Sequence, residues 1–270
     1  MSYAHRLQSS TQNVNTLFSL LILIAFANGF YGRIYKSIDQ YGVIDSIYAT
    51  FGISIVVLFA AWMVYDLISR SSVAINTRLD VAVLTITLSI IIIPSSEFTW
   101  LALTVLSIYY LLQKIDDNAR YGFSILLAIC YSVFWAKLVS KVFMDYISVG
   151  DAFFVALLTG THAEGNLIKA ADGITTLSVG GGCSSFNNLS IAVLGWIVAR
   201  AYFGTRGLKR SLVFVTLSLV SVVFINTVRI GIMALDPSTY EIVHGAIGNN
   251  ITNLLITISI GLISYYGARK

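Results

Sequence analysis

The chain is poor in charged residues, and this limits the class of protein to which it can belong. Only 11% of its 270 residues are charged, 57% are hydrophobic, and the mean hydropathy is +0.81. That is about half the charged fraction of a typical soluble domain, so the chain cannot cover a globule with solvated side chains. The sequence therefore predicts an integral membrane protein.

Cysteine and histidine are scarce as well. Two cysteines make no disulfide framework, and no spacing of cysteine and histidine is typical of a zinc site. The net charge of +4 comes from scattered basic residues and forms no patch for a nucleic acid. We therefore expect no metal, no organic cofactor and no nucleic-acid partner, and we expect membrane lipid to surround the protein.

Long apolar runs are abundant. A hydrocarbon core of about 30 Å needs roughly 20 helical residues, fewer where neighbouring helices shield the ends. The runs predict an all-α polytopic membrane protein with about eight transmembrane helices, forming a single domain over 1–270. They are Val14–Tyr31, Ile47–Tyr65, Leu79–Ile93, Phe98–Leu112, Phe123–Val139, Leu189–Phe203, Leu212–Ile225 and Ile247–Tyr266.

The distribution of basic residues predicts which loops face the cytoplasm. With a cytoplasmic N-terminus most of them fall inside, and the densest cluster, "RGLKR" (Arg206–Arg210), lies between the sixth and seventh runs. The start of the sixth run, the end of the seventh and the start of the eighth then face outward. The first run ends in "AFA" (Ala25–Ala27), in the manner of a signal-peptidase site. Cleavage there would not change which of the remaining loops face the cytoplasm and which face outward.

The longest outward segment precedes the sixth run and ends at Cys183. It begins with Val142–Gly160, an interrupted apolar stretch that predicts an amphipathic or partly embedded helix. Asp172 and Gly173 then form a turn signal between an apolar and a β-branched run, which predicts a small extracytoplasmic hairpin. The glycines at 180–182 allow a tight turn and the close approach of another backbone.

Three residue types with complementary chemistry fall at this outward face. Cys183 stands just before the sixth run, where Ser184, Ser185 and Asn187 are candidate N-caps and the unpaired N–H groups of a helix start favour a thiolate. Arg229 ends the seventh run on the same helix face as Asn226. His244 precedes the eighth run. A thiol, a cationic donor and an acid/base are the groups that acyl transfer requires.

These motifs resemble those of the exosortases and archaeosortases, a family of polytopic membrane cysteine transpeptidases. The family pattern is a cysteine in a Cys-Ser-Gly setting, then Asn-x-x-Arg at the end of the next span, then a histidine often followed by glycine four residues later. The matching residues are Cys183, Ser184, Asn226, Arg229, His244 and Gly248. The motif-bearing part is about 150–266. Ser185 departs from the pattern, because the family has glycine there.

The resemblance implies a cysteine peptidase or transpeptidase in the cell membrane, with its active site on the extracytoplasmic side. Its substrates would be surface proteins with a C-terminal motif, a transmembrane helix and a basic tail, which the enzyme transfers to an acceptor. Cys183 would form a thioester, and His244 would act as general acid/base. Arg229 would stabilise charge with the support of Asn226.

Other interpretations remain open on the sequence. Polar residues in or near apolar surroundings could line the path of a transporter or channel for a small or lipid-linked solute. These residues are Asn28, Lys137, Asn226, Arg229 and Asn253. A non-catalytic assembly protein is a third possibility. Loss of the Cys183 thiol distinguishes them, since only a transpeptidase depends on that nucleophile.

Taken singly, each residue also fits a structural role. Cys183 and Cys130 fit small packed residues, Arg229 fits an arginine that snorkels to the outer headgroups, and His244 fits an interfacial histidine. The order, spacing and shared face of Cys183, Arg229 and His244 favour the catalytic interpretation.

Overall fold

Helices dominate the protein, as the hydropathy predicted, and they group into two units, Met1–Phe134 and Trp135–Lys270. The computed structural model describes residues 3–48, 50–73, 75, 77–181, 183–204 and 207–269, with side chains from residue 15 onward except those of 187 and 246. Each unit is described by itself. All the motif residues named above lie in the second unit.

The first unit consists of helices joined by short loops. Its elements are α1 (Tyr3–Tyr48, broken at Gly42), the 3₁₀ helix η1 (Thr50–Gly52), α2 (Ile55–Ser69), α3 (Arg78–Ile91), α4 (Ser96–Leu111) and α5 (Asp117–Cys130). Local signals set the helix starts: Thr77 and Asp80 form a capping box before α3, and the Asp116 carboxylate accepts the N–H of Ala119 in α5.

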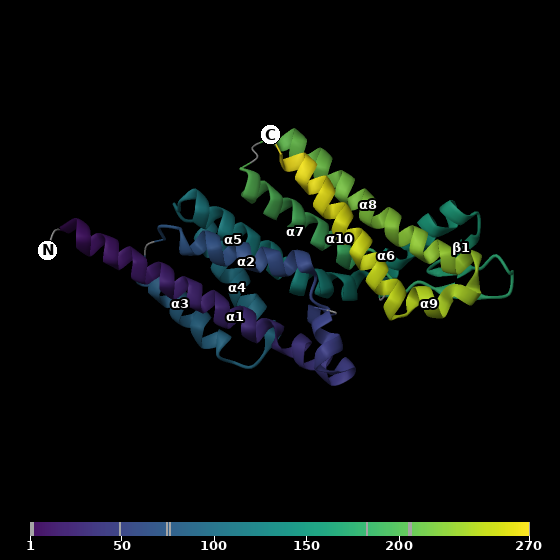
Figure 1. Ribbon diagram of the computed structural model, residues 1–270, viewed down its shortest axis with the longest axis horizontal. Coiled ribbons are helices and arrows are strands. Elements are labelled where there is room, and N and C mark those ends of the chain that lie inside the picture. The colour runs from purple at the N-terminus through teal and green to yellow at the C-terminus, as the bar shows by residue number, and fades with distance from the viewer. Residues whose placement is uncertain are drawn as a thin grey trace. The chain divides into compact units, whose positions relative to one another are not determined.

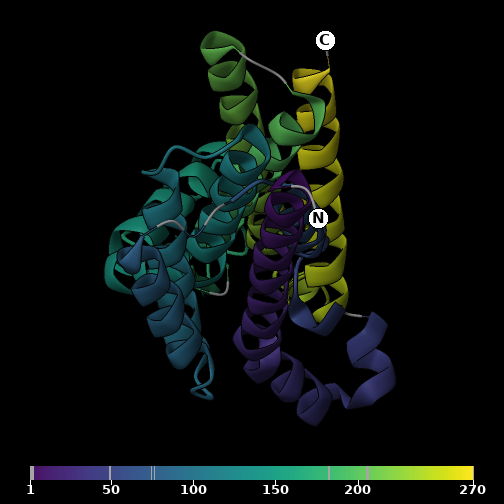
Figure 2. The ribbon, with the colours of Figure 1, turned by 90° about the vertical axis from the view of Figure 1, so that its left-hand side faces the viewer.

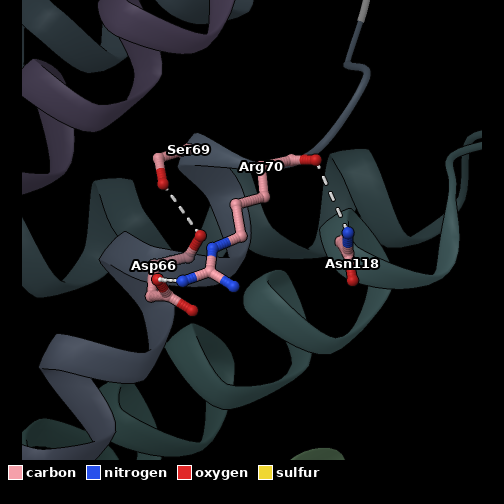
Figure 3. Close-up of polar contacts among 4 residues, drawn as sticks. All are labelled: Asp66, Ser69, Arg70 and Asn118. Atoms are coloured by element: carbon pink, nitrogen blue, oxygen red, sulfur yellow. Dashed lines mark hydrogen bonds and ion pairs between the residues drawn. The ribbon is translucent and has the colours of Figure 1, made fainter.

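Polar side chains join the end of α2 to the start of α5 (Figure 3). Arg70 forms an ion pair with Asp66 at 2.6 Å, and the Ser69 hydroxyl donates to the Asp66 carbonyl at 2.8 Å. The Asn118 amide donates to the carbonyl of Arg70 at 3.5 Å. Because Arg70 is largely exposed, the ion pair contributes at most about 1 kcal/mol to stability. These contacts hold helix ends together.

Asn28 has a packing role in the first unit. Its amide donates to the carbonyls of Ile91 and Ile93, both at 2.7 Å, and to the Thr99 hydroxyl at 2.9 Å. These bonds tie α1 to the end of α3 and the start of α4. The polarity of Asn28 is therefore used inside the unit, which weakens its candidacy for the lining of a transport path.

The second unit carries the site. After the π-helical turn η2 (Tyr131–Trp135) its elements are α6 (Ala136–Thr159), β1 (His162–Glu164), β2 (Leu167–Lys169), β3 (Thr176–Ser178), α7 (Phe186–Phe203), α8 (Leu208–Leu235), η3 (Pro237–Thr239), α9 (Tyr240–His244) and α10 (Ala246–Ala268). Helices α7, α8 and α10 lie side by side (Figures 1 and 2) around the buried residues Ala192, Val222, Ile256 and Ile260. The starts of α7 and α10 and the end of α8 lie at one end of this bundle.

The predicted hairpin is present as β2 and β3 within a three-stranded antiparallel sheet of order β1-β2-β3. Gly173 forms the predicted turn with φ of 71°, and the strand that we did not predict, β1, reaches β2 through a turn at Gly165 with φ of 61°. The Ala171 N–H donates to the Ala234 carbonyl at 2.9 Å. This bond ties the hairpin to the end of α8.

Among the described residues, four helical stretches, and not about eight, are long and apolar enough to cross a membrane. They are Asn15–Tyr48, Asp117–Thr159, Leu208–Leu235 and Ile247–Ala268. The predicted count of about eight is not supported, because several runs form short helices: α2, for example, has 15 residues and is about 22 Å long. Separately, the predicted fifth run and most of the Val142–Gly160 stretch lie in one helical segment, Asp117–Thr159, which has non-helical backbone at Phe143.

Apolar side chains are exposed along one face of α8. Val213, Leu217, Val220 and Phe224 recur at intervals of three and four residues, which places them on a single stripe. Surface of this kind and extent is normally covered by lipid or by a partner. It agrees with a membrane protein.

Candidate active site

Cys183 lies in the loop between β3 and α7. Its N–H donates to the Gly180 carbonyl at 2.9 Å, and its own carbonyl accepts a hydrogen bond from the Asn226 amide at 2.7 Å. The side chain carries a free thiol and packs, half-buried, against the core formed by α6, the sheet and α8. The backbone at the proposed nucleophile is therefore held in place by α8.

The two serines after Cys183 define the start of α7. The Ser184 hydroxyl accepts the N–H of Phe186 at 3.2 Å, but Ser184 is not the N-cap: that position is Ser185, whose hydroxyl makes no capping bond. Ser185 donates its N–H and its hydroxyl to the two carboxylate oxygens of Asp151 in α6, at 3.1 and 2.6 Å. The side chain of Asn187, another N-cap candidate, lies outside the described residues.

Asp151 is a site residue that sequence reasoning missed. It is buried on α6, in a stretch that we interpreted only as an amphipathic helix. The available signal was an acidic residue inside the apolar sequence "SVGDAFFV", because a carboxylate in such surroundings needs donors nearby. Its partner, Ser185, is the residue that departs from the family pattern.

Asn226 and Arg229 share a buried face of α8, as their spacing predicted; Asn226 is 1% exposed and Arg229 is 8% exposed. Arg229 Nε donates to the Val243 carbonyl at 3.3 Å. Its Nη2 is buried and has no hydrogen-bond partner among the described residues. Arg229 is thus held inside the protein and does not snorkel. A buried donor without a partner is unfavourable, so an incoming acceptor would be bound there.

The Cys183 thiol has a raised pKa. Burial raises the pKa most, the positive charge of Arg229 lowers it, and the negative charge of Asp151 raises it further. The expectation that the helix start favours a thiolate is wrong for this site, because burial of the thiol, together with the Asp151 carboxylate at the start of α7, outweighs the effect of Arg229. The resting residue at neutral pH is a thiol, which needs a base to become a nucleophile.

His244 is the last residue of α9, and its ring stacks on that of Tyr240 with centroids 4.9 Å apart. In the part of the chain that the structure describes, no hydrogen bond joins this ring to Cys183. The residue before His244 connects α9 to the site: the Val243 carbonyl accepts a hydrogen bond from Arg229, and the Val243 side chain packs on the same core as Cys183. The acid/base role of His244 stays a prediction.

Gly248 makes the corner between α9 and α10 possible. A Cβ at this position would lie 2.2 Å from the carbonyl oxygen of Val243, the oxygen that accepts from Arg229. At Gly245 a Cβ would lie 2.4 Å from the carbonyl oxygen of Glu241. Both contacts are with backbone and cannot be relieved by a side-chain rotation. The position four residues after His244 therefore requires glycine for steric reasons, because any side chain there would clash with the Val243 carbonyl.

The glycines before Cys183 lie in the predicted tight turn, since the Cys183 N–H donates to the Gly180 carbonyl, but the predicted close approach of another backbone is not found at Gly180 or Gly181. A Cβ on Gly180 would meet nothing within 4 Å, and one on Gly181 would meet only the Met144 side chain. No neighbouring backbone approaches these two, and Gly182 lies outside the described residues. The surface at Gly180 is open. Elsewhere, Cys130 is fully buried, and the described residues contain no cluster of His, Cys, Asp and Glu that could hold a metal ion.

No family model, curated protein or solved structure matches the chain. The fold is consistent with an all-α membrane protein with four candidate spans in its described residues; in its second unit Asn226 bonds the Cys183 carbonyl and Arg229 shares the buried face of Asn226.

Proposed function

We propose that this protein is a membrane cysteine transpeptidase or protease that cleaves the C-terminal sorting signals of surface proteins. The observation that carries the proposal is the relation of Cys183 to α8. Asn226 holds its carbonyl, and Arg229, one helical turn later, offers a buried N–H that has no partner in the described part of the chain. A thiol beside a fixed cationic donor suits acyl transfer. The motif resemblance to exosortases and archaeosortases supports the same function.

In this mechanism, Cys183 attacks a backbone carbonyl of the substrate. Because the resting thiol is protonated, His244 accepts its proton as the S–C bond forms. The Arg229 Nη2 donates to the oxyanion that develops on the substrate. When the C–N bond breaks, the leaving amine takes the proton from His244 and departs with the transmembrane helix and basic tail. An acceptor amine then attacks the thioester and regenerates the thiol.

We assign the site to the extracytoplasmic face from the charges of the second unit alone. The opposite end of the bundle carries Lys209 and Arg210, and Arg210 donates to the carbonyls of Tyr266 and Arg269 at the end of α10. By the positive-inside rule this basic end faces the cytoplasm. The Cys183 end is then outside, whatever the total number of spans.

The test compares surface proteins that carry a C-terminal helix in cells with the wild-type protein and with Cys183→Ala. We expect the full-length precursor to accumulate in the variant, as an immunoblot of a tagged substrate would report. Cys130→Ala is the matched control, because it removes a buried thiol that has no role in the mechanism. Normal processing in Cys183→Ala would favour a transporter or an assembly protein; equal loss in both variants would indicate a packing role for Cys183.

A further inference from the structure

Asp151 is a carboxylate in the interior of the second unit, and the proposed reaction gives it no task. It is 5% exposed, and Ser185, which it contacts, is 4% exposed. Taking a carboxylate out of water is strongly unfavourable unless hydrogen bonds replace its hydration. The presence of Asp151 here calls for donors that are fixed in place.

Ser185 supplies two such donors. Its N–H donates to one carboxylate oxygen at 3.1 Å and its hydroxyl to the other at 2.6 Å. Ser185 immediately precedes α7, so the carboxylate also lies at the positive end of the helix dipole. The negative charge is thereby stabilised and attached to one backbone position.

That backbone position is two residues from Cys183. Asn226 holds the carbonyl of Cys183 from α8 at 2.7 Å, while Asp151 holds Ser185 from α6. Side chains from two different helices therefore fix the loop that presents the thiol, one on each side of Ser184.

We infer that Asp151 is a positioning residue for Cys183, which fixes the loop that carries the thiol through Ser185 and sets a negative charge opposite the positive charge of Arg229. The inference rests on the proposed function only in taking Cys183 as the nucleophile. No ion pair joins Asp151 and Arg229 among the described residues, so each charge acts on the thiol by itself.

The charges around the thiol come from several elements. Arg229 on α8 lowers the pKa of Cys183, and Asp151 on α6 raises it, in addition to the effect of burial. The titratable groups of α9 are Tyr240 and Glu241, which are exposed, and His244, which is half-buried; those of the sheet are exposed, namely His162, Glu164 and Lys169. Removal of the Asp151 charge should therefore lower the pKa of Cys183 and increase the fraction of thiolate at a given pH.

Alkylation of Cys183 by iodoacetamide tests the inference on the full chain in detergent, with the Cys183 peptide quantified by mass spectrometry. The rate at high pH, where the thiol is ionised, reports access to the sulfur; the midpoint of the pH profile reports the charge near it. Asp151→Asn removes the charge, yet its amide can still accept from the Ser185 N–H and donate to the hydroxyl. Asp151→Ala removes the charge and both bonds.

Exposed Asp145, on the same helix, provides matched controls in Asp145→Asn and Asp145→Ala. We expect Asp151→Asn to move the midpoint to lower pH and to raise the rate below the midpoint about threefold, since a lower pKa of Cys183 gives a larger thiolate fraction at a given pH. Its high-pH rate should match the wild type. Asp151→Ala should raise the alkylation rate at high pH, because the loop that carries Cys183 is no longer held. Ser185→Ala should raise the same rate, and it serves as the test if Asp151→Ala fails to accumulate.

Two results would overturn the inference. One is a midpoint in Asp151→Asn equal to that of Asp145→Asn; the other is a high-pH rate that neither Asp151→Ala nor Ser185→Ala raises above the wild type. Because alkylation needs no substrate, failure of the proposed function is distinguishable. If the proposed function is wrong, the wild-type protein will process no surface protein, yet the changes in Cys183 alkylation in the Asp151 and Ser185 variants will persist.

Discussion

At the scale of single residues, Arg229 presents two donors from one guanidinium. Its Nε is occupied by the Val243 carbonyl, while its Nη2 is buried and has no hydrogen-bond partner among the described residues. A planar guanidinium holds these donors in a fixed fork, whereas a lysine ammonium is a compact charge on a flexible stem. One lysine cannot both hold Val243 and present a second, oriented donor.

Arg229→Lys should therefore accumulate in membranes near the wild-type level yet process its substrate at least about a hundredfold more slowly, the usual loss for one oxyanion donor. Immunoblots of the membrane fraction and substrate turnover have to be measured on the same samples. Arg210→Lys, at the opposite end of the bundle, is the control and should turn over normally. Near-normal turnover in Arg229→Lys would mean that any positive charge suffices there.

At the scale of elements, the α9–α10 corner depends on Gly248. A Cβ there would lie 2.2 Å from the Val243 carbonyl oxygen, so Gly248→Ala must push α9 away and draw Val243 off Arg229. We expect a loss of stability of about 1–3 kcal/mol, typical of overpacking, together with reduced processing. Thermal unfolding in detergent and turnover would measure the two effects.

Gly261→Ala is the matched control for this prediction, because Gly261 lies on the same helix and a Cβ there meets nothing within 4 Å. Alanine is the better helix former, so this variant should be neutral or stabilised by up to about 1 kcal/mol. If both variants unfolded alike, the close contact at Val243 would not be the cause.

Elements whose signals are local could be predicted from the sequence. Asp172 and Gly173 predicted the hairpin turn, and the three-residue spacing of Asn226 and Arg229 predicted their shared face. The span count could not be obtained in the same way, because hydropathy reports apolar composition and does not fix where a helix ends. The bond from Asp151 to Ser185 also escaped prediction, since it joins residues 34 positions apart in sequence.

At the scale of the whole molecule, the proposed side of the membrane can be tested by labelling. In a chain whose own cysteines are replaced by serine, Ile174→Cys should react with a membrane-impermeant maleimide in intact cells, because Ile174 is 89% exposed at the hairpin turn. Ile174 is a better position than Asp172, whose carboxylate holds the turn through Ile174 and Thr175.

Gly207→Cys, at the basic end of the bundle, should react only after lysis. The reverse pattern would put the Cys183 end in the cytoplasm and remove most of the case for processing of surface proteins. Labelling at both positions in intact cells would instead indicate leaky membranes, and an unlabelled cytoplasmic marker protein excludes that outcome.

The hairpin bond to α8 bears on how the protein tolerates different bilayers. The segment from Ala171 to Cys183 is fastened to α8 at two points, Ala234 and Asn226, which lie eight residues or about 12 Å apart along the helix. A thinner or thicker bilayer changes the tilt of a spanning helix. Because the thiol loop is fastened to the helix that carries Arg229, both should tilt together and keep their separation. Turnover in vesicles of different acyl-chain length should then vary less than the tilt of α8, and a steep dependence of turnover on chain length would mean that the loop moves independently of the helix.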